Sequence, residues 1–446
     1  MKPSHAVQQT GGHQRIAVIG GGIAGLGSAW LLSQSHRVRL FEAGPYVGGH
    51  THTVDVDIDG TIFPVDTGFL VFNERTYPNL CAFFDLLGVR AVESDMSFAV
   101  SLADPALEWA GSDLGTLFAQ RRNLLRPAFL RMLADILRFN RESTRMAAGE
   151  PGPALSLGDY LAAERYSTAF RDWYLLPMAA AIWSCPTRTM LDYPLTTFVR
   201  FCHNHGLLQI FDRPRWRTVA GGGRSYVQRI LRDVGDVKVA TPVLGVRRQP
   251  DGVWVRSKDG IERFDEVVFA CHSDQTLAIL GADASDEERR ILGAVRYQPN
   301  VALLHTDTAL LPRRRKVWSA WNYLAGSSGA DGRPVSVSYL INRLQPLPVD
   351  TPVVVSLNPF TEPAPERLIR RIEYAHPVFD QAAITAQAAL PGIQGHHHSW
   401  FAGAWTGYGF HEDGLRSAIA VAEGLGVGIP WRATPGTTAA PLREAA

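Results

Sequence analysis

Apolar runs separated by small residues organise the first fifty positions of the chain. Residues 16–19 are four consecutive apolar residues, which predicts a short buried strand. This strand runs directly into three glycines spaced as G-x-G-x-x-G, namely Gly20, Gly22 and Gly25. Apolar residues then recur at helical spacing over 23–33, and a second apolar run at 38–41 predicts another strand that ends on Glu42. The pattern therefore predicts one complete β-α-β unit.

The glycine turn of this unit has the form that binds a dinucleotide. Gly20 permits the tight turn, Gly22 lets a pyrophosphate approach the backbone, and Gly25 lets the helix pack close to the strand. The helix begins at Ile23 and Ala24, so its free N–H groups and the positive end of its dipole face the phosphates. We expect these five residues to bind the cofactor.

Glu42 strengthens this prediction because it lies 22 residues after Gly20 (42 − 20). An acid about 20 residues after the first glycine accepts hydrogen bonds from the adenosine ribose hydroxyls. A glycine-rich turn alone also occurs in ordinary packing. Strand, turn, helix, strand and terminal acid together favour a dinucleotide site.

Further along, the pattern alternates between strands, helices and one long apolar segment. Residues 53–62 alternate as a strand pair about an Asp-Gly turn, and a helix is predicted over 77–87. Residues 160–211 are rich in aromatic residues and poor in charge, which fits either a large apolar pocket or a domain core. From 218 a glycine turn leads into an amphipathic helix and short strands. Residues 400–426 repeat the order of strand, glycine-rich turn and helix.

Length and charge exclude several classes of protein. A chain of 446 residues is too long for one core, so we expect two domains. The 44 basic and 43 acidic residues give a net charge of +1, which argues against nucleic acid as a partner. No stretch has the ~20 apolar residues that a spanning helix needs, and no signal peptide is recognised. A cytoplasmic location is expected.

The cysteines and histidines do not form a metal motif, so no metal is expected. The four cysteines are scattered without C-x-x-C spacing: Cys81, Cys185, Cys202 and Cys271. Two histidines, His203 and His205, lie beside one of these thiols but lack a fourth ligand at a zinc-like spacing. The histidine run at 396–398 is too local to form a site alone.

A basic segment at 121–145 predicts an amphipathic helix with seven Arg against Asp135 and Glu142. Five of its apolar residues are expected to share one face: Phe129, Leu130, Leu133, Ile136 and Leu137. Such a helix either lies on an anionic membrane surface or packs on its own domain with a solvated Arg face. The same alternatives apply to the basic segment at 310–318.

The first unit also resembles a known family. Five residues separate Glu42 from Gly48-Gly49-His50, and this E-x5-G-G pattern resembles the fingerprint of the FAD-dependent amine oxidase and phytoene desaturase superfamily. The resemblance implies FAD as the cofactor and assigns these three residues to the FAD site. The family has Arg after the glycine pair, where this chain has histidine.

The resemblance implies further FAD contacts along the chain. The segment around Gly68 would approach the flavin ring, and Val243 would meet the adenine through its backbone. The C-terminal segment would contact the ribityl chain and the flavin edge through Gly403, Gly414 and Leu415. The family's acid after the first of these glycines is Ala404 here, so its contact is expected to be lost or to move to Glu412 or Asp413.

The implied fold is an α/β, Rossmann-like FAD-binding domain with a mixed α/β substrate domain, each in several pieces. The expected FAD-binding pieces are 15–75, 215–285 and 395–431. The expected substrate-domain pieces are 76–214 and 286–394, with terminal tails at 1–14 and 432–446.

Three strings, DTGFLVFNERTYPNL, ACHSDQ and GYGFHEDGLRS, resemble the flavoprotein branch that occurs beside cyclopropane and methyl fatty acid synthases. This implies an oxidoreductase that desaturates a methylated or otherwise modified fatty acyl chain by hydride transfer to the flavin. A lipid or acyl substrate and a methyltransferase partner follow from the same resemblance. A base within hydrogen-bond reach is also needed, and four residues are candidates: Glu74, His305, His411 and Glu412.

Two alternatives to acyl desaturation stay open. In amine oxidation, many enzymes of the family place a Lys beside the flavin, whereas the corresponding position here reads Asn300, which leans away from amines. The chain could instead be a flavin-bearing partner of a lipid methyltransferase that does no redox chemistry itself.

Overall fold

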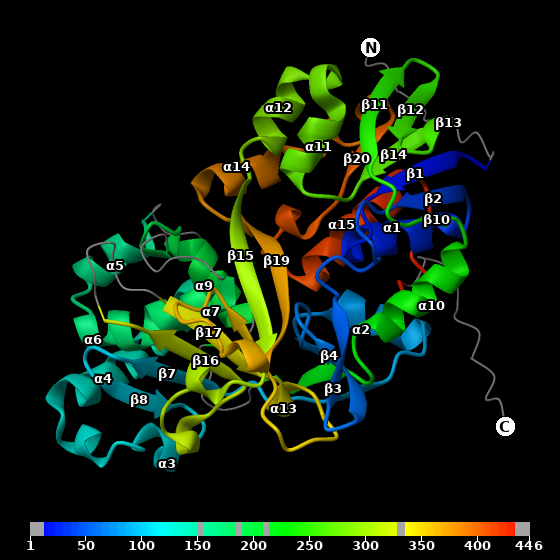
Figure 1. Ribbon diagram of the computed structural model, residues 1–446. Helices are drawn as coiled ribbons and strands as arrows, with labels where there is room; N and C mark the ends of the chain where they lie inside the picture. The colour runs from blue at the N-terminus through cyan, green and yellow to red at the C-terminus, as the bar shows by residue number, and fades with distance from the viewer. Residues whose placement is uncertain are drawn as a thin grey trace.

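The computed structural model describes residues 13–149, 155–183, 190–204, 206–207, 214–327 and 335–432. Most of the two expected tails lies outside this part of the chain, as do Cys185 and His205. The described chain forms two halves, which lie at the upper right and lower left of Figure 1.

A five-stranded parallel sheet forms the centre of the first half. Its strand order is β10-β2-β1-β14-β20. The strands span Val237–Lys238 (β10), Arg37–Phe41 (β2), Arg15–Ile19 (β1), Glu266–Phe269 (β14) and Ser399–Phe401 (β20). Parallel strands covered on both faces need apolar residues at successive positions, which explains the unbroken apolar run at 16–19.

Helices cover one face of this sheet, and a small antiparallel sheet with three further helices covers the other. The first group comprises α1 (Ile23–Ser33), α2 (Pro78–Leu86), α10 (Arg224–Val234) and α15 (His411–Gly424). The second comprises β11 (Val243–Gln249), β12 (Gly252–Ser257), β13 (Gly260–Phe264), α11 (Ser273–Leu280), α12 (Asp286–Leu292) and α14 (Gln381–Ala389). The Rossmann-like arrangement is confirmed.

A seven-stranded mixed sheet forms the second half, in the order β19-β15-β18-β17-β16-β7-β8. Its strands are β7 (Phe98–Leu102), β8 (Leu107–Ala110), β15 (Arg296–His305), β16 (Trp321–Ala325), β17 (Val335–Leu340), β18 (Val354–Leu357) and β19 (Leu368–Val378). The helices of this half are α3 (Leu114–Leu117), α4 (Pro127–Ala148), α5 (Leu157–Ala163), α6 (Thr168–Phe170), α7 (Leu176–Trp183), α9 (Leu195–Asn204) and α13 (Ile341–Leu344).

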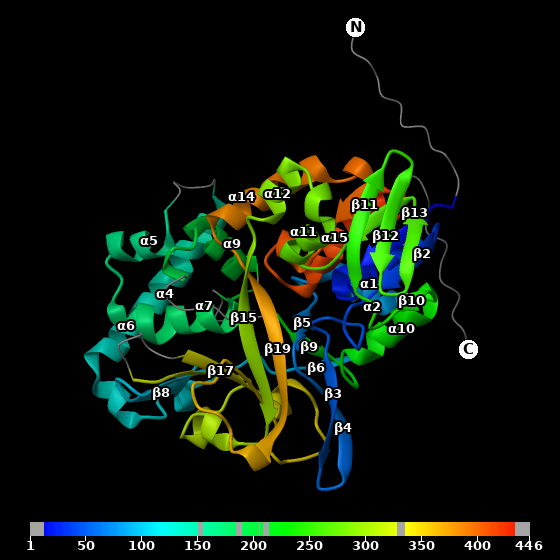
Figure 2. The same cartoon turned by 45° about the horizontal axis from the view of Figure 1, so that its top comes forward.

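Long strands and small sheets join the two halves. Strands β15 and β19 pair over their whole length and run from one half to the other (Figure 2). The predicted strand pair is present as the hairpin of β3 (Thr53–Ile58) and β4 (Thr61–Asp66). A third small sheet has the order β5-β9-β6, from Phe72–Asn73, Trp216–Val219 and Ala91–Glu93.

The packing of some helices differs from the expected division of the chain. Helices α2, α12 and α14 fall in segments assigned to the substrate domain, yet their apolar residues pack in the two cores beside the five-stranded sheet. Sequence order does not reveal this, because each helix lies beside strands distant in the chain. No helix in the described residues is long and apolar enough to cross a membrane.

The basic segment folds differently from its prediction. A 3-10 turn at Arg121–Leu125 precedes α4, which begins at Pro127. Phe129 is fully buried in the core, but Leu130 and Leu137 are exposed, so the prediction that they share its face is wrong. Helix α4 therefore packs on its own domain through a narrower apolar face.

Candidate FAD-binding and active site

A cavity of about 680 Å³ lies at the carboxyl ends of the parallel strands, where the two halves meet. Ligands bind at this edge of parallel α/β sheets because loops and helix N-termini converge there. The cavity continues from the glycine turn into an apolar region formed by both halves. This region includes Leu70, Met96, Ile182, Phe201, Leu207, Trp321, Tyr339, Val355 and Leu357.

The three glycines of the first turn differ in what surrounds them. Gly20 has a φ of 107°, and a Cβ there would lie 2.9 Å from the backbone of Ala270. A Cβ on Gly25 would overlap the carbonyl oxygen of Gly20, so this glycine permits the close packing of α1 on β1. A Cβ on Gly22 would meet nothing within 4 Å. Gly22 therefore borders the open space above the first turn of α1.

The second glycine pair supports the first turn. The N–H of Gly48 donates to the carbonyl oxygen of Gly21 at 2.8 Å. A Cβ on Gly49, whose φ is +57°, would lie 3.0 Å from the Cα of Gly22. The E-x5-G-G pattern is thus explained by a second loop that packs directly on the glycine turn.

Glu42 lies at the end of β2 on the cavity wall. Its carboxylate accepts hydrogen bonds from the N–H groups of Gly21 at 2.8 Å and Gly44 at 2.6 Å. Among the described residues that line the cavity, Glu42 is the only member of the four charged types Asp, Glu, Lys and Arg. The carboxylate is therefore held where a ribose hydroxyl could donate to it.

The residues present fit FAD. Gly22, Ile23 and Ala24 line the cavity at the N-terminus of α1, where a pyrophosphate binds favourably. The cavity also offers two buried polar atoms without a protein partner, His50 Nε2 and Trp405 Nε1. Such atoms are costly to bury unless a ligand satisfies them. FAD would be held by these groups and would supply a two-electron acceptor.

Other predicted FAD residues divide into two groups. Gly20, Gly68, Val243 and Gly403 line the cavity. A second group lies behind its wall: Gly25, Gly48, Asp413, Gly414 and Leu415. A Cβ on Gly414 would lie 2.7 Å from a methyl group of Ile23, so Gly414 packs α15 against α1. The Asp413 carboxylate accepts from the N–H of Phe410 at 3.0 Å and caps α15.

Four histidines line the cavity: His50, His272, His376 and His411. Burial lowers the pKa of His411 to about 3, and burial and then nearby His272 lower the pKa of His376 to about 4. Burial also lowers the pKa of His50 well below its usual value. These three imidazoles are neutral at neutral pH.

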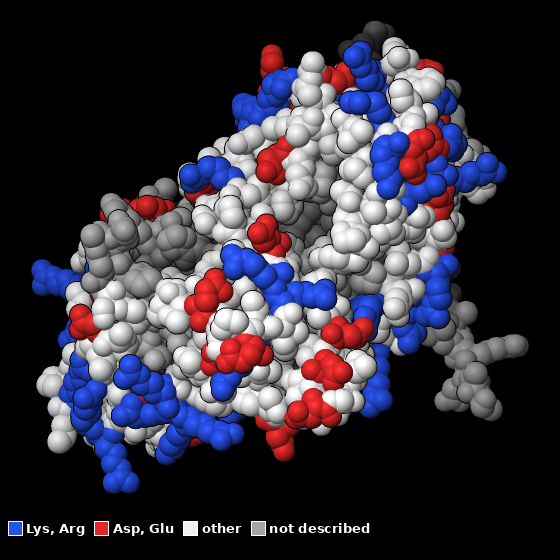
Figure 3. All heavy atoms as spheres, in the orientation of Figure 1, with Lys and Arg blue, Asp and Glu red and all other residues white. Residues whose placement is uncertain are grey.

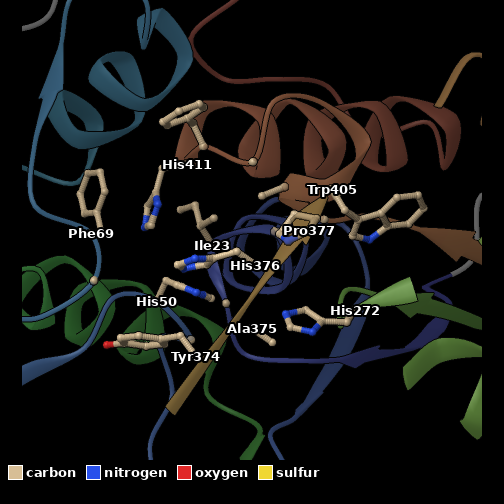
Figure 4. Close-up of a pocket in the computed structure, with 18 of the residues that line it drawn as sticks. Ile23, His50, Phe69, His272, Tyr374, Ala375, His376, Pro377, Trp405 and His411 are labelled. Atoms are coloured by element: carbon tan, nitrogen blue, oxygen red, sulfur yellow. The ribbon is translucent and has the colours of Figure 1, made fainter. Parts of the chain in front are cut away.

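The rings of the cavity form two stacks (Figure 4). His50 stacks on Tyr374, with ring centroids 4.8 Å apart, and lies 5.1 Å from His376. His411 stacks on Phe69 at 3.7 Å and hydrogen-bonds through Nε2 to Thr51 Oγ1 at 2.9 Å. His411, one of the predicted catalytic residues, thus reaches the cavity.

The other three catalytic candidates lie outside the cavity lining, and this corrects their assignment. The Glu74 side chain is 69% exposed and forms an ion pair with Arg217 at 2.8 Å. His305 is fully buried, where it bonds Ser356 Oγ through Nε2 at 2.8 Å. The Glu412 carboxylate accepts from the N–H of Leu80 at 3.0 Å, at the start of α2. Their partners give these side chains structural roles.

Sequence reasoning missed His272, His376 and Tyr374. His272 follows β14 at the carboxyl edge of the parallel sheet, where a ligand-facing residue is expected. Tyr374 and His376 lie two residues apart on β19 and so share one face of the strand. Recognition of 368–378 as a strand would have placed both.

The described residues contain no group of three or more His, Cys, Asp or Glu side chains arranged to hold a metal ion.

The long apolar segment at 160–211 contributes both to the cavity and to a domain core. Ile182, Phe201 and Leu207 line the cavity, whereas Phe170 and Phe198 pack in a core cluster of α4, α5 and α9.

The parallel sheet, the glycine turn and the cavity define a two-domain FAD-dependent oxidoreductase. A model of the flavin-containing amine oxidoreductases matches residues 23–310, more than half of the chain. The chain belongs to this family, and the predicted FAD amine oxidase and phytoene desaturase superfamily is confirmed.

A curated relative and two solved structures are also similar to this chain. The chain is 27% identical over 337 residues to a carotenoid phi-ring synthase of Streptomyces griseus, covering 70% of this chain and 61% of that protein. The cyclohexylamine oxidase of Brevibacterium oxydans has the same fold, with a TM-score of 0.65 and 17% identity over 93% of this chain and all of the other. A fatty acid isomerase of P. acnes is similar in fold, with a TM-score of 0.64 and 14% identity over 92% and 98%.

Proposed function

We propose that this flavoenzyme desaturates a long apolar chain, with a methylated or otherwise modified fatty acyl group as its substrate. The observation that carries the proposal is the charge of the cavity. Beyond Glu42 at the predicted ribose position, no Asp, Glu, Lys or Arg lines it among the described residues. An alkyl chain has no polar group to recognise, so a neutral apolar wall is what such a substrate requires.

Desaturation removes a hydride from one carbon and a proton from its neighbour. Both electrons of the broken C–H bond leave with the hydride, and bound FAD would supply the acceptor for it. The proton passes to water or to a neutral imidazole of the cavity, and a double bond forms between the two carbons. Repeated turnover would also require an external two-electron oxidant.

Amine oxidation is less well supported by this cavity. A protonated amine binds most favourably beside a carboxylate, and the described apolar region contains none. The position expected for a Lys is Asn300, which is 2% exposed and hydrogen-bonded to His376. Relatives named for a carotenoid and a fatty acid suit an apolar substrate.

Anaerobic mixing of the FAD-loaded protein with candidate substrates tests the proposal. A modified acyl lipid should bleach the oxidised flavin, and mass spectrometry should find a product lacking two hydrogens. Leu357→Asp, which puts a carboxylate on the apolar wall, should slow this reaction strongly, whereas Leu357→Met should not. Bleaching by amines and not by acyl lipids would overturn the substrate assignment. We also propose a lipid methyltransferase as a partner. When such an enzyme is added, the modified lipid that it produces should be consumed by the flavoprotein.

We also propose contact with an anionic bilayer, from which such a substrate would be taken. Leu125, among the arginines of 121–126, is 87% exposed, and Leu114 of α3 is 75% exposed. The basic residues of 313–316 are also exposed. They lie near α3, since Lys316 approaches Gly115 of that helix. Figure 3 shows basic side chains gathered over α3 and α4. Exposed leucines among basic residues suit a lipid surface better than a nucleic acid. We name residues 114–131 and 313–316 the basic-leucine face.

A further inference from the structure

A chain of two amides, the buried Asn300 and the exposed Asn358, begins beside the cavity. The Oδ1 atom of Asn358 accepts from the backbone N–H of Val301 at 2.9 Å, so its Nδ2 must donate, and it does so to Asn300 Oδ1 at 2.6 Å. The Nδ2 of Asn300 donates to the carbonyl oxygen of Gln298 at 2.9 Å. A backbone N–H can only donate and a backbone carbonyl can only accept. Both amide orientations are therefore determined by the main chain of β15.

The same Asn300 Nδ2 lies 3.0 Å from Nδ1 of His376. Since this amide nitrogen is a donor, Nδ1 must be the acceptor and the ring proton must be on Nε2. The ring is neutral because burial and His272 lower its pKa to about 4. Nε2 has no hydrogen-bond partner among the described residues, and His376 lines the cavity (Figure 4).

We propose that Asn300 is a positioning residue that holds His376 in its Nε2–H tautomer, and that His376 donates this hydrogen bond to an acceptor atom of the bound flavin ring. The alkyl part of the proposed acyl substrate offers no acceptor, whereas the edge of a flavin ring carries carbonyl oxygens and ring nitrogens. A donor at this edge favours the more electron-rich, reduced ring, and so raises its reduction potential. The same tautomer excludes Nε2 of His376 as the acceptor of the substrate proton. The inference rests on the family's cofactor and not on the acyl substrate.

Nitrogen NMR of the FAD-loaded, 15N-histidine-labelled protein tests the tautomer. The signals of His376, assigned by their loss in His376→Gln, should show a protonated Nε2 and an unprotonated Nδ1. In Asn300→Asp the carboxylate can only accept, so the proton should move to Nδ1. Gln298→Ala is the matched control, because it keeps the backbone carbonyl and should leave the signals unchanged. A protonated Nδ1 and an unprotonated Nε2 in the unmodified protein would overturn the inference.

Two measurements without substrate test the contact to the flavin. His376→Phe and Asn300→Leu should weaken FAD binding about three- to tenfold, as expected for one lost hydrogen bond. Both should lower the reduction potential of the bound flavin, whereas His376→Gln, which retains an N–H donor, should restore most of the affinity. Unchanged affinity and potential in folded His376→Phe would refute the contact. If the protein does not turn over an acyl substrate, the expected changes in FAD affinity and in reduction potential stay the same.

Discussion

The carboxylate of Glu42 accepts a hydrogen bond from the N–H of Gly21 at 2.8 Å, and this contact ties the end of β2 to the glycine turn after β1. A second bond from the N–H of Gly44 at 2.6 Å holds the other oxygen. Two backbone donors therefore orient a carboxylate at the cavity wall before any nucleotide binds. Glu42 thus holds the end of β2 against the glycine turn, and it is also expected to contact the ribose.

Glu42→Ala should therefore weaken FAD binding about 10- to 100-fold, through loss of one charge-assisted hydrogen bond and of the loop geometry. Glu42→Gln should have a smaller effect, because its amide oxygen can still accept from one of the two N–H groups. Titration of the apoprotein with FAD, followed by flavin fluorescence, measures both affinities. Glu93→Ala, at an exposed position on β6, is the control. Equal FAD affinity in Glu42→Ala and the control would contradict the assignment.

The parts of this site that sequence could predict are local. Gly20, Gly22, Gly25 and Glu42 stand at spacings set by one β-α-β unit, so their positions follow from the chain itself. The pair of Asn300 and His376 joins residues 76 apart on two strands, and only the strand register brings them together. Hydrophobic patterning identifies a strand but not its partner.

Glu412 shows the same limit for a predicted catalytic residue. A carboxylate in the first turn of α15 fits a catalytic acid or base equally well from sequence. Its actual partners are the N–H groups of Asn79 and Leu80 at 3.2 and 3.0 Å, more than 300 residues earlier in the chain. Glu412 thus satisfies two of the free N–H groups at the start of α2.

Glu412→Ala should lower the free energy of unfolding by about 1–3 kcal/mol, because it leaves buried N–H groups without an acceptor. The rate of flavin reduction by substrate should change little in the folded variant. Glu74→Ala should change the free energy of unfolding by less than about 0.5 kcal/mol, since it removes only an exposed ion pair. Chemical denaturation and stopped-flow reduction measure the two effects. A large loss of rate with unchanged stability in Glu412→Ala would restore its catalytic assignment.

His305 should make the protein less stable in mild acid. Burial lowers its pKa from 6.5 to about 4, so the unfolded chain binds a proton that the folded chain does not. Its contribution to stability is present above pH 6.5 and is lost as pH falls towards 4. The difference of about 2.5 pH units corresponds to at most about 3 kcal/mol.

In His305→Gln the free energy of unfolding should therefore decrease less as pH falls from 6.5 to 4. Part of the decrease should remain, because other buried histidines also contribute to it. Denaturation curves at several pH values measure the slope, and His396→Gln, at an exposed position, should leave it unchanged. Because His305 lies outside the cavity lining, the pH profile of flavin reduction should not shift. A shifted profile with an unchanged stability slope would point to a catalytic role.

The basic-leucine face should bind vesicles that contain an anionic phospholipid and bind neutral phosphatidylcholine vesicles weakly. Arg121 and Arg122 contribute through charge, so the double change to Gln should weaken binding about tenfold, and added salt should weaken it further. Leu124 is 51% exposed beside Leu125, and changing both to Ser should also weaken binding about tenfold by removing inserted apolar surface. Ile62→Ser removes an isolated exposed side chain, 71% exposed on the β3–β4 hairpin, and should have no effect. Cosedimentation of the FAD-loaded protein with each vesicle type measures these differences. Equal loss in the Leu124, Leu125 and Ile62 variants, or binding to nucleic acid in preference to vesicles, would show that this surface has another purpose.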